Sequence, residues 1–136
     1  MRVLFDTDVI IDFINDRENA KYAEDVLLMT FVSKIDGYIT PKSVIDIRYV
    51  VKHVVNDEEM TRMIIKNTIS QLTVTDTLGE DIYSAFDSKI NDFEDAVLIN
   101  NAERYGIDYI ISNNLKDFAG SPIKVLSPKQ FLDLYK

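Results

Sequence analysis

The sequence contains no cysteine, and its single histidine is His53. Without cysteine, the chain cannot form disulfides, thiolate metal sites or a cysteine nucleophile. His53 follows Lys52 on what we expect to be a polar helix face, which favours an exposed side chain over a catalytic one. Acidic side chains therefore become the first candidates for any chemistry.

Long apolar runs are also missing, since none approaches the roughly 18 residues of a membrane span. The opening residues, MRVLFDTD, lack a signal-peptide pattern because an acid interrupts the apolar run early, so we expect a cytoplasmic protein. With only four glycines and three prolines and a 46% hydrophobic share, the chain has the composition of an ordinary globular protein. Its 136 residues predict one domain, 1–136, with a real core.

Positive charge is scarce: 15 Lys and Arg face 23 Asp and Glu, giving a net charge of −8. This argues against broad, non-specific binding of nucleic acid through the surface field. It does not exclude a nuclease, because a metal-loaded pocket has its own local potential. Some acids belong to solvated helix surface, such as Asp57-Glu58-Glu59, and the rest lie near apolar segments.

Short apolar strands alternate with helical patterns along the whole chain. We expect strands at residues 3–5, 38–39, 72–74, 109–111 and 124–126. We expect helices at residues 9–15, 20–34, 41–55, 57–70, 77–89, 92–105 and 128–135. This alternation predicts a three-layer α/β/α sandwich around a central, mostly parallel sheet of about five short strands.

Several helix ends carry recognisable signals. Thr77 with Glu80, and Asn91 with Glu94, have the spacing of capping boxes. Gly37 is expected to stop the helix at 20–34, and the glycine at position 106 stands where a C′ residue should.

The stretch RVLFDTDVIID is the centre of the prediction. A buried strand runs directly into Asp6-Thr7-Asp8, at the strand end where open α/β sheets place ligands. Carboxylates there repel each other and lose hydration, which costs stability unless something compensates. Mg²⁺ or Mn²⁺ is the usual compensator, because both prefer oxygen ligands. The alternative is that one of the two acids only caps the following helix, a role that Asp8 suits better.

Acids sit beside apolar positions at three further places. Asp46 lies inside the helix at 41–55, where it could simply pair with Lys42 four residues earlier. Asp95 shares a helix face with apolar residues and lies too far into the helix to be its cap, whereas Asp92 could be that cap. The third place follows the strand at 109–111, where Asn114 and Asp117 could also cap a turn.

Five segments, in this order and spacing, together resemble the PIN domain, the nuclease fold of the toxins in VapBC-type toxin–antitoxin pairs. The segments are VLFDTDVIID at the start, TPKSVIDIRY from Thr40, NDFEDA from Asn91, YIISNNLKDF from Tyr109, and VLSPKQFL near the end. The resemblance covers nearly the whole chain.

The resemblance implies a metal-dependent endoribonuclease with Mg²⁺ or Mn²⁺ as cofactor. The family's first three acids fall on Asp6, Asp46 and Asp95, and the fourth falls on Asp117 or Asn114. Three positions depart from the common pattern: Asp46 stands where many members have Glu, Asp8 where many have Asn, and Asn114 where many have Asp.

The resemblance also implies an RNA substrate, a homodimer and a cognate antitoxin. Asp8, Asp92, Ser112 and Thr7 are further candidates for the site. The two hydroxyls could orient water or metal ligands, or satisfy local backbone groups. Lysine and arginine side chains near the acids could touch RNA phosphates; these are Lys42, Arg48, Lys52 and Lys116.

Two other functions fit parts of the sequence. FDTDV also matches the opening of haloacid-dehalogenase-like phosphatases, in which Asp6 would be the nucleophile and Asp8 the general acid. In that reading Glu94-Asp95 would be the distal metal pair, with Ser43 and Lys89 as loose candidates for the remaining motifs. The other possibility is a catalytically degenerate PIN-like module that binds RNA or protein and cuts nothing.

Overall fold

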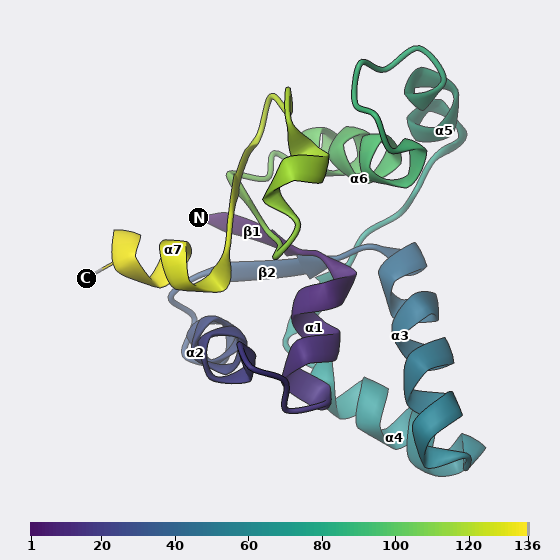
Figure 1. Ribbon diagram of the computed structural model, residues 1–136, viewed down its shortest axis with the longest axis vertical. Helices are drawn as coiled ribbons and strands as arrows, with labels where there is room; N and C mark the ends of the chain where they lie inside the picture. The colour runs from purple at the N-terminus through teal and green to yellow at the C-terminus, as the bar shows by residue number, and fades with distance from the viewer. Residues whose placement is uncertain (136) are drawn as a thin grey trace.

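The computed structural model describes residues 1–135 (Figure 1). A five-stranded sheet has the order β3-β2-β1-β4-β5, and every neighbouring pair is parallel. The strands are β1 (Arg2–Phe5), β2 (Asp36–Ile39), β3 (Leu72–Val74), β4 (Tyr109–Ile111) and β5 (Lys124–Leu126). The α/β fold class and the parallel sheet predicted from the alternation of elements are therefore confirmed.

Helices connect the strands and cover both faces of the sheet. They are α1 (Thr7–Ile14), α2 (Ala20–Phe31), α3 (Pro41–Val55), α4 (Glu58–Thr68), α5 (Gly79–Ala85), α6 (Phe93–Arg104) and α7 (Pro128–Leu134), with a 3₁₀ helix, η1 (Leu115–Phe118). Within residues 1–135, no helix is long and apolar enough to cross a membrane.

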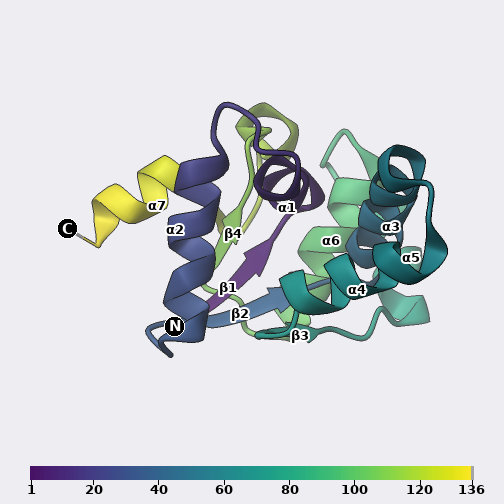
Figure 2. The same ribbon diagram turned by 90° about the horizontal axis from the view of Figure 1, so that it is seen from below.

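Alternate residues of β1 supply the two cores. Val3 and Phe5 pack with apolar side chains of α1, α2, α3, α4 and α7 on one face. Leu4 packs with α6 and η1 on the other face. Figures 1 and 2 show α1 and α2 on one side of the sheet and α6 on the opposite side. The period of two along a strand thus produces the three layers.

The order of the strands places a crevice at the carboxyl end of β1. The chain moves from β1 to β2 on one side, and later returns to β4 on the other side of β1. Phe5 pairs with Ile111, so Asp6 and Ser112 leave the sheet at the same level. This reversal of strand order is where open α/β sheets bind ligands.

Both predicted capping boxes are wrong. Asp92, not Asn91, caps α6, because its Oδ1 accepts the Asp95 N–H at 3.0 Å. Thr77 does not open α5, since its Oγ1 accepts a hydrogen bond from Asn101 instead. Helix α5 begins at residue 79, where Asp81 Oδ2 accepts the Leu78 N–H at 2.9 Å.

Gly37 was expected to stop the preceding helix, but this prediction is wrong, because Gly37 lies inside β2. Helix α2 ends earlier, at Phe31, and Ser33 then takes a positive φ of 57°. A Cβ at position 37 would lie 2.7 Å from Thr30 Cγ2 and 2.5 Å from Leu72 Cδ2. Glycine is therefore needed here for the close approach of β2 to α2.

Candidate functional site

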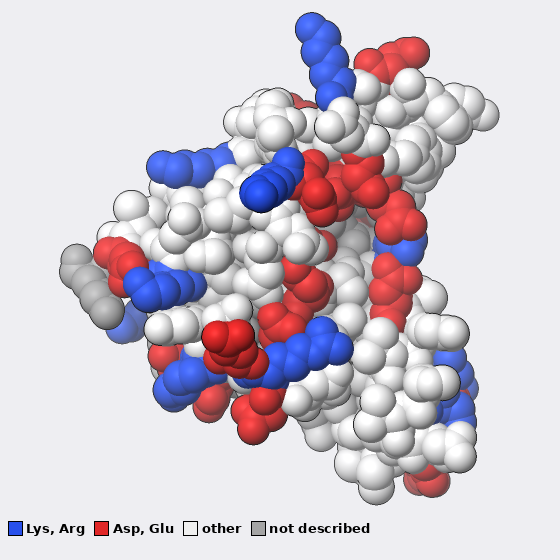
Figure 3. All heavy atoms as spheres, in the orientation of Figure 1, with Lys and Arg blue, Asp and Glu red and all other residues white. Residues whose placement is uncertain are grey.

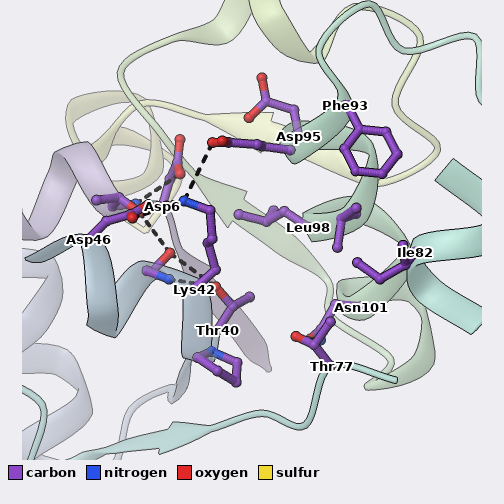
Figure 4. Close-up of a pocket in the computed structure, with 15 residues that line it drawn as sticks. Asp6, Thr40, Lys42, Asp46, Thr77, Ile82, Phe93, Asp95, Leu98 and Asn101 are labelled. Carbon is purple, nitrogen blue, oxygen red and sulfur yellow. Dashed lines mark hydrogen bonds and ion pairs between the residues drawn. The ribbon is translucent and has the colours of Figure 1, made fainter. Parts of the chain in front are cut away.

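A cavity of about 280 Å³ lies at the carboxyl end of β1. It is bounded by the first turns of α1, α3 and α6, together with residues of α5 and of the loop before it. Asp6, Asp46, Glu94 and Asp95 line its acidic part, and Ile82, Phe93, Val97 and Leu98 line its apolar part. Figure 4 shows the labelled acids on one side and the labelled apolar residues on the other, and Figure 3 shows acidic side chains gathered around the hollow.

Asp6 is the most firmly held of the acids. Its Oδ1 accepts the Thr7 N–H at 2.8 Å, and its Oδ2 accepts a hydrogen bond from Ser112 Oγ at 2.8 Å. Burial raises the pKa of Asp6, and the charges of Asp117 and Asp92 raise it further, although the two hydrogen bonds act in the opposite direction. Asp6 caps α1 and faces the cavity as well, so the expectation that Asp8 is the better cap is wrong.

Two hydroxyl groups hold the surroundings of Asp6 in place. Ser112 is fully buried, and its Oγ also accepts the Asn114 N–H at 3.0 Å. Thr7 Oγ1 donates to Ser43 Oγ at 2.8 Å, and Ser43 in turn is bonded to Thr40, the cap of α3. The first turns of α1 and α3 are thereby joined at the edge of the cavity.

The pKa of Asp95 is affected by the charges of acids from three separate segments of the chain. Its pKa is raised to about 7, first by burial and then by the charges of Asp92, Asp6, Asp117 and Glu94. These groups must therefore lie close enough to repel one another. Asp92 is at the same time the cap of α6, so the simple interpretation of that residue is also correct.

Asp117 is the charged member of the two candidates for the fourth acid. It lies in η1, on the exposed side of the site, and its charge raises the pKa of both Asp6 and Asp95. Asn114 is exposed and uncharged, and its backbone N–H is bonded to Ser112. Neither residue lines the cavity itself.

Asp46 faces the cavity from α3, but a lysine holds its carboxylate. Lys42 Nζ lies 2.9 Å from Asp46 Oδ1 and 2.7 Å from Asp46 Oδ2. The same ammonium lies 3.7 Å from Glu94 Oε2, on α6. The pair with Lys42 that the sequence offered as an alternative is therefore present, within the candidate site.

Asp8 does not line the cavity. Its Oδ2 accepts the Asn113 N–H at 3.3 Å, and its Oδ1 is buried without a hydrogen-bond partner. Burial, and then the charge of Asp6, raise the pKa of Asp8 to about 6. Asn113 also donates to Asp12 at 2.6 Å, so this asparagine ties the loop after β4 to α1.

Glu94 and Asn113 are the contributors that the sequence analysis did not single out for the nuclease site. Glu94 was read as part of a capping box, because the spacing to Asn91 matched that motif. The only sequence feature that could have indicated Glu94 as a site residue is its position next to Asp95, since two adjacent acids at the start of a helix can face the same cleft. The two hydrogen bonds of Asn113 join segments about 100 residues apart, so no local sequence pattern could have predicted them.

The donors of this site suit a hard divalent cation. Within residues 1–135, no three His, Cys, Asp or Glu side chains lie close enough together, as they stand, to hold an ion. Asp6, Asp46, Asp95 and Asp117 are nevertheless all carboxylates, the donors that Mg²⁺ and Mn²⁺ prefer. Burial, and then the charges of neighbouring acids, raise the pKa of Asp6 and Asp95, as expected of carboxylates without enough positive charge nearby.

Comparison with known proteins identifies the family. The model of the PIN domain matches residues 2–116. A search of curated proteins finds no match.

Among solved structures, VapBC2 from Rickettsia felis, bound to a DNA fragment from their promoter, is similar with a TM-score of 0.72 and 15% identity, over 93% of this chain and 98% of that one. A toxin–antitoxin complex from Klebsiella pneumoniae has a TM-score of 0.67 and 23% identity, over 93% and 97% of the two chains. VapBC-1 from nontypeable Haemophilus influenzae has a TM-score of 0.65 and 14% identity, over 95% and 99%.

At these identities the solved structures establish the shared fold, and the family model covers most of the chain. The resemblance found in the sequence is confirmed, and this chain belongs to the PIN domain family.

Proposed function

We propose that this protein is a divalent-metal-dependent endoribonuclease that hydrolyses phosphodiester bonds of single-stranded RNA. The observation that supports this most is the mutual influence of Asp6, Asp95 and Asp117, which belong to three distant segments. PIN domains are generally nucleases, and a set of acids at the carboxyl end of a parallel sheet suits a metal-dependent one.

In this proposal Asp6, Asp46, Asp95 and Asp117 would hold Mg²⁺ or Mn²⁺. A bound ion supplies positive charge beside the scissile phosphate and makes water a better nucleophile. Asp6 is the anchor of the set, because Ser112 Oγ and the Thr7 N–H fix both of its oxygens. Asp92 adds negative charge behind Asp95 and orients the first turn of α6.

Asp8 and Asn114 have supporting roles in this proposal. Asp8 is held by the Asn113 backbone and lies outside the cavity, so it acts on the site through its charge beside Asp6. Asn114 contributes its backbone N–H to Ser112, which in turn binds Asp6.

Cleavage of a single-stranded RNA in Mg²⁺ or Mn²⁺ tests the proposal. Asp6→Asn and Asp95→Asn should each lower the rate by about 100-fold or more, because each removes a charged ligand. Asp25→Asn is the control, since Asp25 is a paired acid on α2, remote from the cavity. Cleavage that continues undiminished in excess EDTA would contradict the proposal.

We further propose that the protein is the toxin of a type II toxin–antitoxin pair, with a cognate antitoxin as partner and cytoplasmic RNA as substrate. Three of the similar structures are described as VapBC or toxin–antitoxin complexes, which supports this assignment. Induced expression of the wild-type chain in a bacterial host should arrest growth, whereas Asp95→Asn should not. Equal growth with both chains would speak against a toxin.

A homodimer is supported by apolar side chains that lie exposed on α3 and α5. Ile45 and Tyr49 on α3 are 63% and 73% exposed, and Tyr83 on α5 is 76% exposed. Both helices contribute residues to the cavity, and large apolar side chains exposed beside a site are typical of an interface. Light scattering should give twice the mass of the chain, and Tyr49→Asp should reduce it to that of a monomer.

Experiments on the same site distinguish the nuclease from the two other functions, the phosphatase and the non-cleaving module. The phosphatase would require a phosphorylated Asp6, but the family assignment favours a nuclease. A degenerate module would bind no Mn²⁺ in a way that depends on Asp6 and Asp95, which calorimetric titration measures directly.

A further inference from the structure

Lys42 is the only basic side chain that lines the cavity within residues 1–135. It lies in the first turn of α3, and its ammonium contacts both carboxylate oxygens of Asp46. The ammonium also lies 3.7 Å from Glu94 on the opposite wall. One positive charge therefore bridges two helices across the mouth of the acidic cavity (Figure 4).

A second lysine shows what an ordinary helical pair looks like in this protein. Lys21 Nζ lies 3.1 Å from Asp25 Oδ1, four residues further along α2. The side chains of Asp25 and Asp46 are 38% and 39% exposed, so the two acids are equally accessible to solvent. The pair on α2 lines no part of the cavity, whereas the pair on α3 lines it beside Asp6 and Asp95.

The ion pair with Lys42 competes with the proposed role of Asp46 as a metal ligand. The Lys42 ammonium contacts both Asp46 oxygens and neutralises the negative charge that would attract an ion to this carboxylate. An ammonium and a divalent ion close to each other also repel. Lysine binds carboxylates as a point charge on a flexible stem, so it can leave without any change in the backbone.

We propose that Lys42 is an internal counter-cation, which holds the Asp46 carboxylate in the metal-free protein and is displaced when a divalent ion binds. The inference rests on the proposed metal-dependent function, because it needs an ion that competes for the same acid. Lys42 is then a positioning residue: it keeps Asp46 turned into the site and sets the concentration of ion needed to load it.

Calorimetric titration with Mn²⁺ tests the competition directly. Lys42→Met removes the charge but keeps the length of the side chain, so it should bind Mn²⁺ about two- to fivefold more tightly than the wild type, the gain expected from losing one exposed pair. Lys42→Arg keeps the positive charge and should bind close to the wild type. Lys21→Met is the matched control and should leave the affinity unchanged.

Each other result overturns a distinct part of the argument. Equal or weaker Mn²⁺ binding by Lys42→Met, with normal binding by the wild type, would overturn the role of Lys42 and leave the metal-dependent function standing. The absence of Mn²⁺ binding by every variant would overturn both.

A measurement on the wild type avoids any effect of substitution on folding. In nitrogen-15 spectra of lysine side chains, an ammonium held by a carboxylate should give an observable signal. The signal of Lys42 should be present in EDTA and should shift or disappear at saturating Mg²⁺, while that of Lys21 should stay. An unchanged Lys42 signal at saturating Mg²⁺ would show that the lysine is not displaced.

Discussion

At the level of single residues, the site is built from acids whose charged form is destabilised by burial and by neighbouring acids. The pKa of Asp95 is raised to about 7 by burial and by four neighbouring acids. Such strain at a few residues is common where a protein binds ligands, because the ligand relieves it.

Asp95 should make the stability of the metal-free protein fall as the pH rises. Its folded pKa of about 7 lies above the ordinary value of 3.8 for an aspartate, so the folded state binds the proton more tightly. The stabilisation is complete below about pH 4 and is lost as the pH rises through 7. Asp95→Asn should flatten this dependence and stabilise the protein at pH 8 by roughly 1 kcal/mol, a value reduced because solvent screens a partly exposed group.

Urea denaturation in EDTA at pH 5 and pH 8 measures the effect. Asp25→Asn is a suitable control, since its carboxylate is paired with Lys21 away from the cavity. If Asp95→Asn were less stable than the wild type at pH 8, the carboxylate would be contributing a favourable contact, and the assignment of mutual repulsion would be wrong.

Removal of the Ser112 hydroxyl should lower both the stability of the protein and its affinity for Mn²⁺. Ser112→Ala removes the donor to Asp6 Oδ2 and the acceptor for the Asn114 N–H. The loss of two buried hydrogen bonds should cost about 1–3 kcal/mol of stability. Loss of a partner that orients a metal ligand should lower Mn²⁺ affinity by about 10- to 100-fold.

Calorimetry with Mn²⁺ and thermal unfolding, carried out together, separate the two effects of Ser112→Ala. Ser121→Ala is a useful comparison, because its hydroxyl also makes two hydrogen bonds, both to the Ile123 backbone and none to an acid. Wild-type Mn²⁺ affinity in Ser112→Ala would mean that Asp6 does not depend on this serine for its orientation.

At the level of elements, periodicity was enough to find the strands and helices but not their ends. Three strands and α3 have the predicted bounds, since their apolar pattern and the Thr40-Pro41 start are local features. The start of α5 could not be found in this way. It is fixed by Asp81, whose carboxylate binds Arg104 of α6 at 2.8 and 3.0 Å as well as the Leu78 N–H. A contact between residues 23 positions apart thus overrides the local capping signal.

The packing of β2 against α2 gives a prediction of its own. Gly37→Ala would place a Cβ within 2.7 Å of Thr30 Cγ2, a stiff side chain that is only 6% exposed. The strand would have to move, which should cost about 1–3 kcal/mol. Thermal or chemical unfolding measures this cost.

Gly79→Ala is the matched control for that substitution. A Cβ at Gly79 would have no heavy atom within 4 Å, and the residue begins helix α5, where alanine is favoured over glycine. We expect this variant to be as stable as the wild type or slightly more so. Equal stability of the two alanine variants would show that β2 and α2 are not closely packed at position 37.

At the level of the whole molecule, the sequence indicated the fold and most members of the site, because each acid follows a recognisable element. What the sequence left open was how side chains from distant segments meet. It could not decide between Asn114 and Asp117, because the choice depends on how η1 turns back toward β1. It also could not show that Lys42 contacts Glu94 as well as Asp46, since that contact needs α3 and α6 to lie on opposite sides of one cavity.

The excess of negative charge makes the folded chain sensitive to a bound cation. With a net charge of −8 and repelling acids in one cavity, a divalent ion that binds only the folded state should stabilise the whole molecule. At an ion concentration of 100 times Kd the gain is about 2.7 kcal/mol, which for a chain of this size should raise Tm by roughly 5–10 °C.

Thermal unfolding in EDTA and in increasing Mn²⁺ tests this prediction, with NaCl of equal ionic strength as the control for general screening. The double variant Asp6→Asn, Asp95→Asn should lose the Mn²⁺ effect, because it lacks two of the acids whose repulsion the ion relieves. It should also be more stable than the wild type in EDTA at pH 8, since that repulsion is gone. A Tm that rises equally with Mn²⁺ and with NaCl would mean that the ion acts on the surface charge in general, and that the acids around the cavity do not form a binding site.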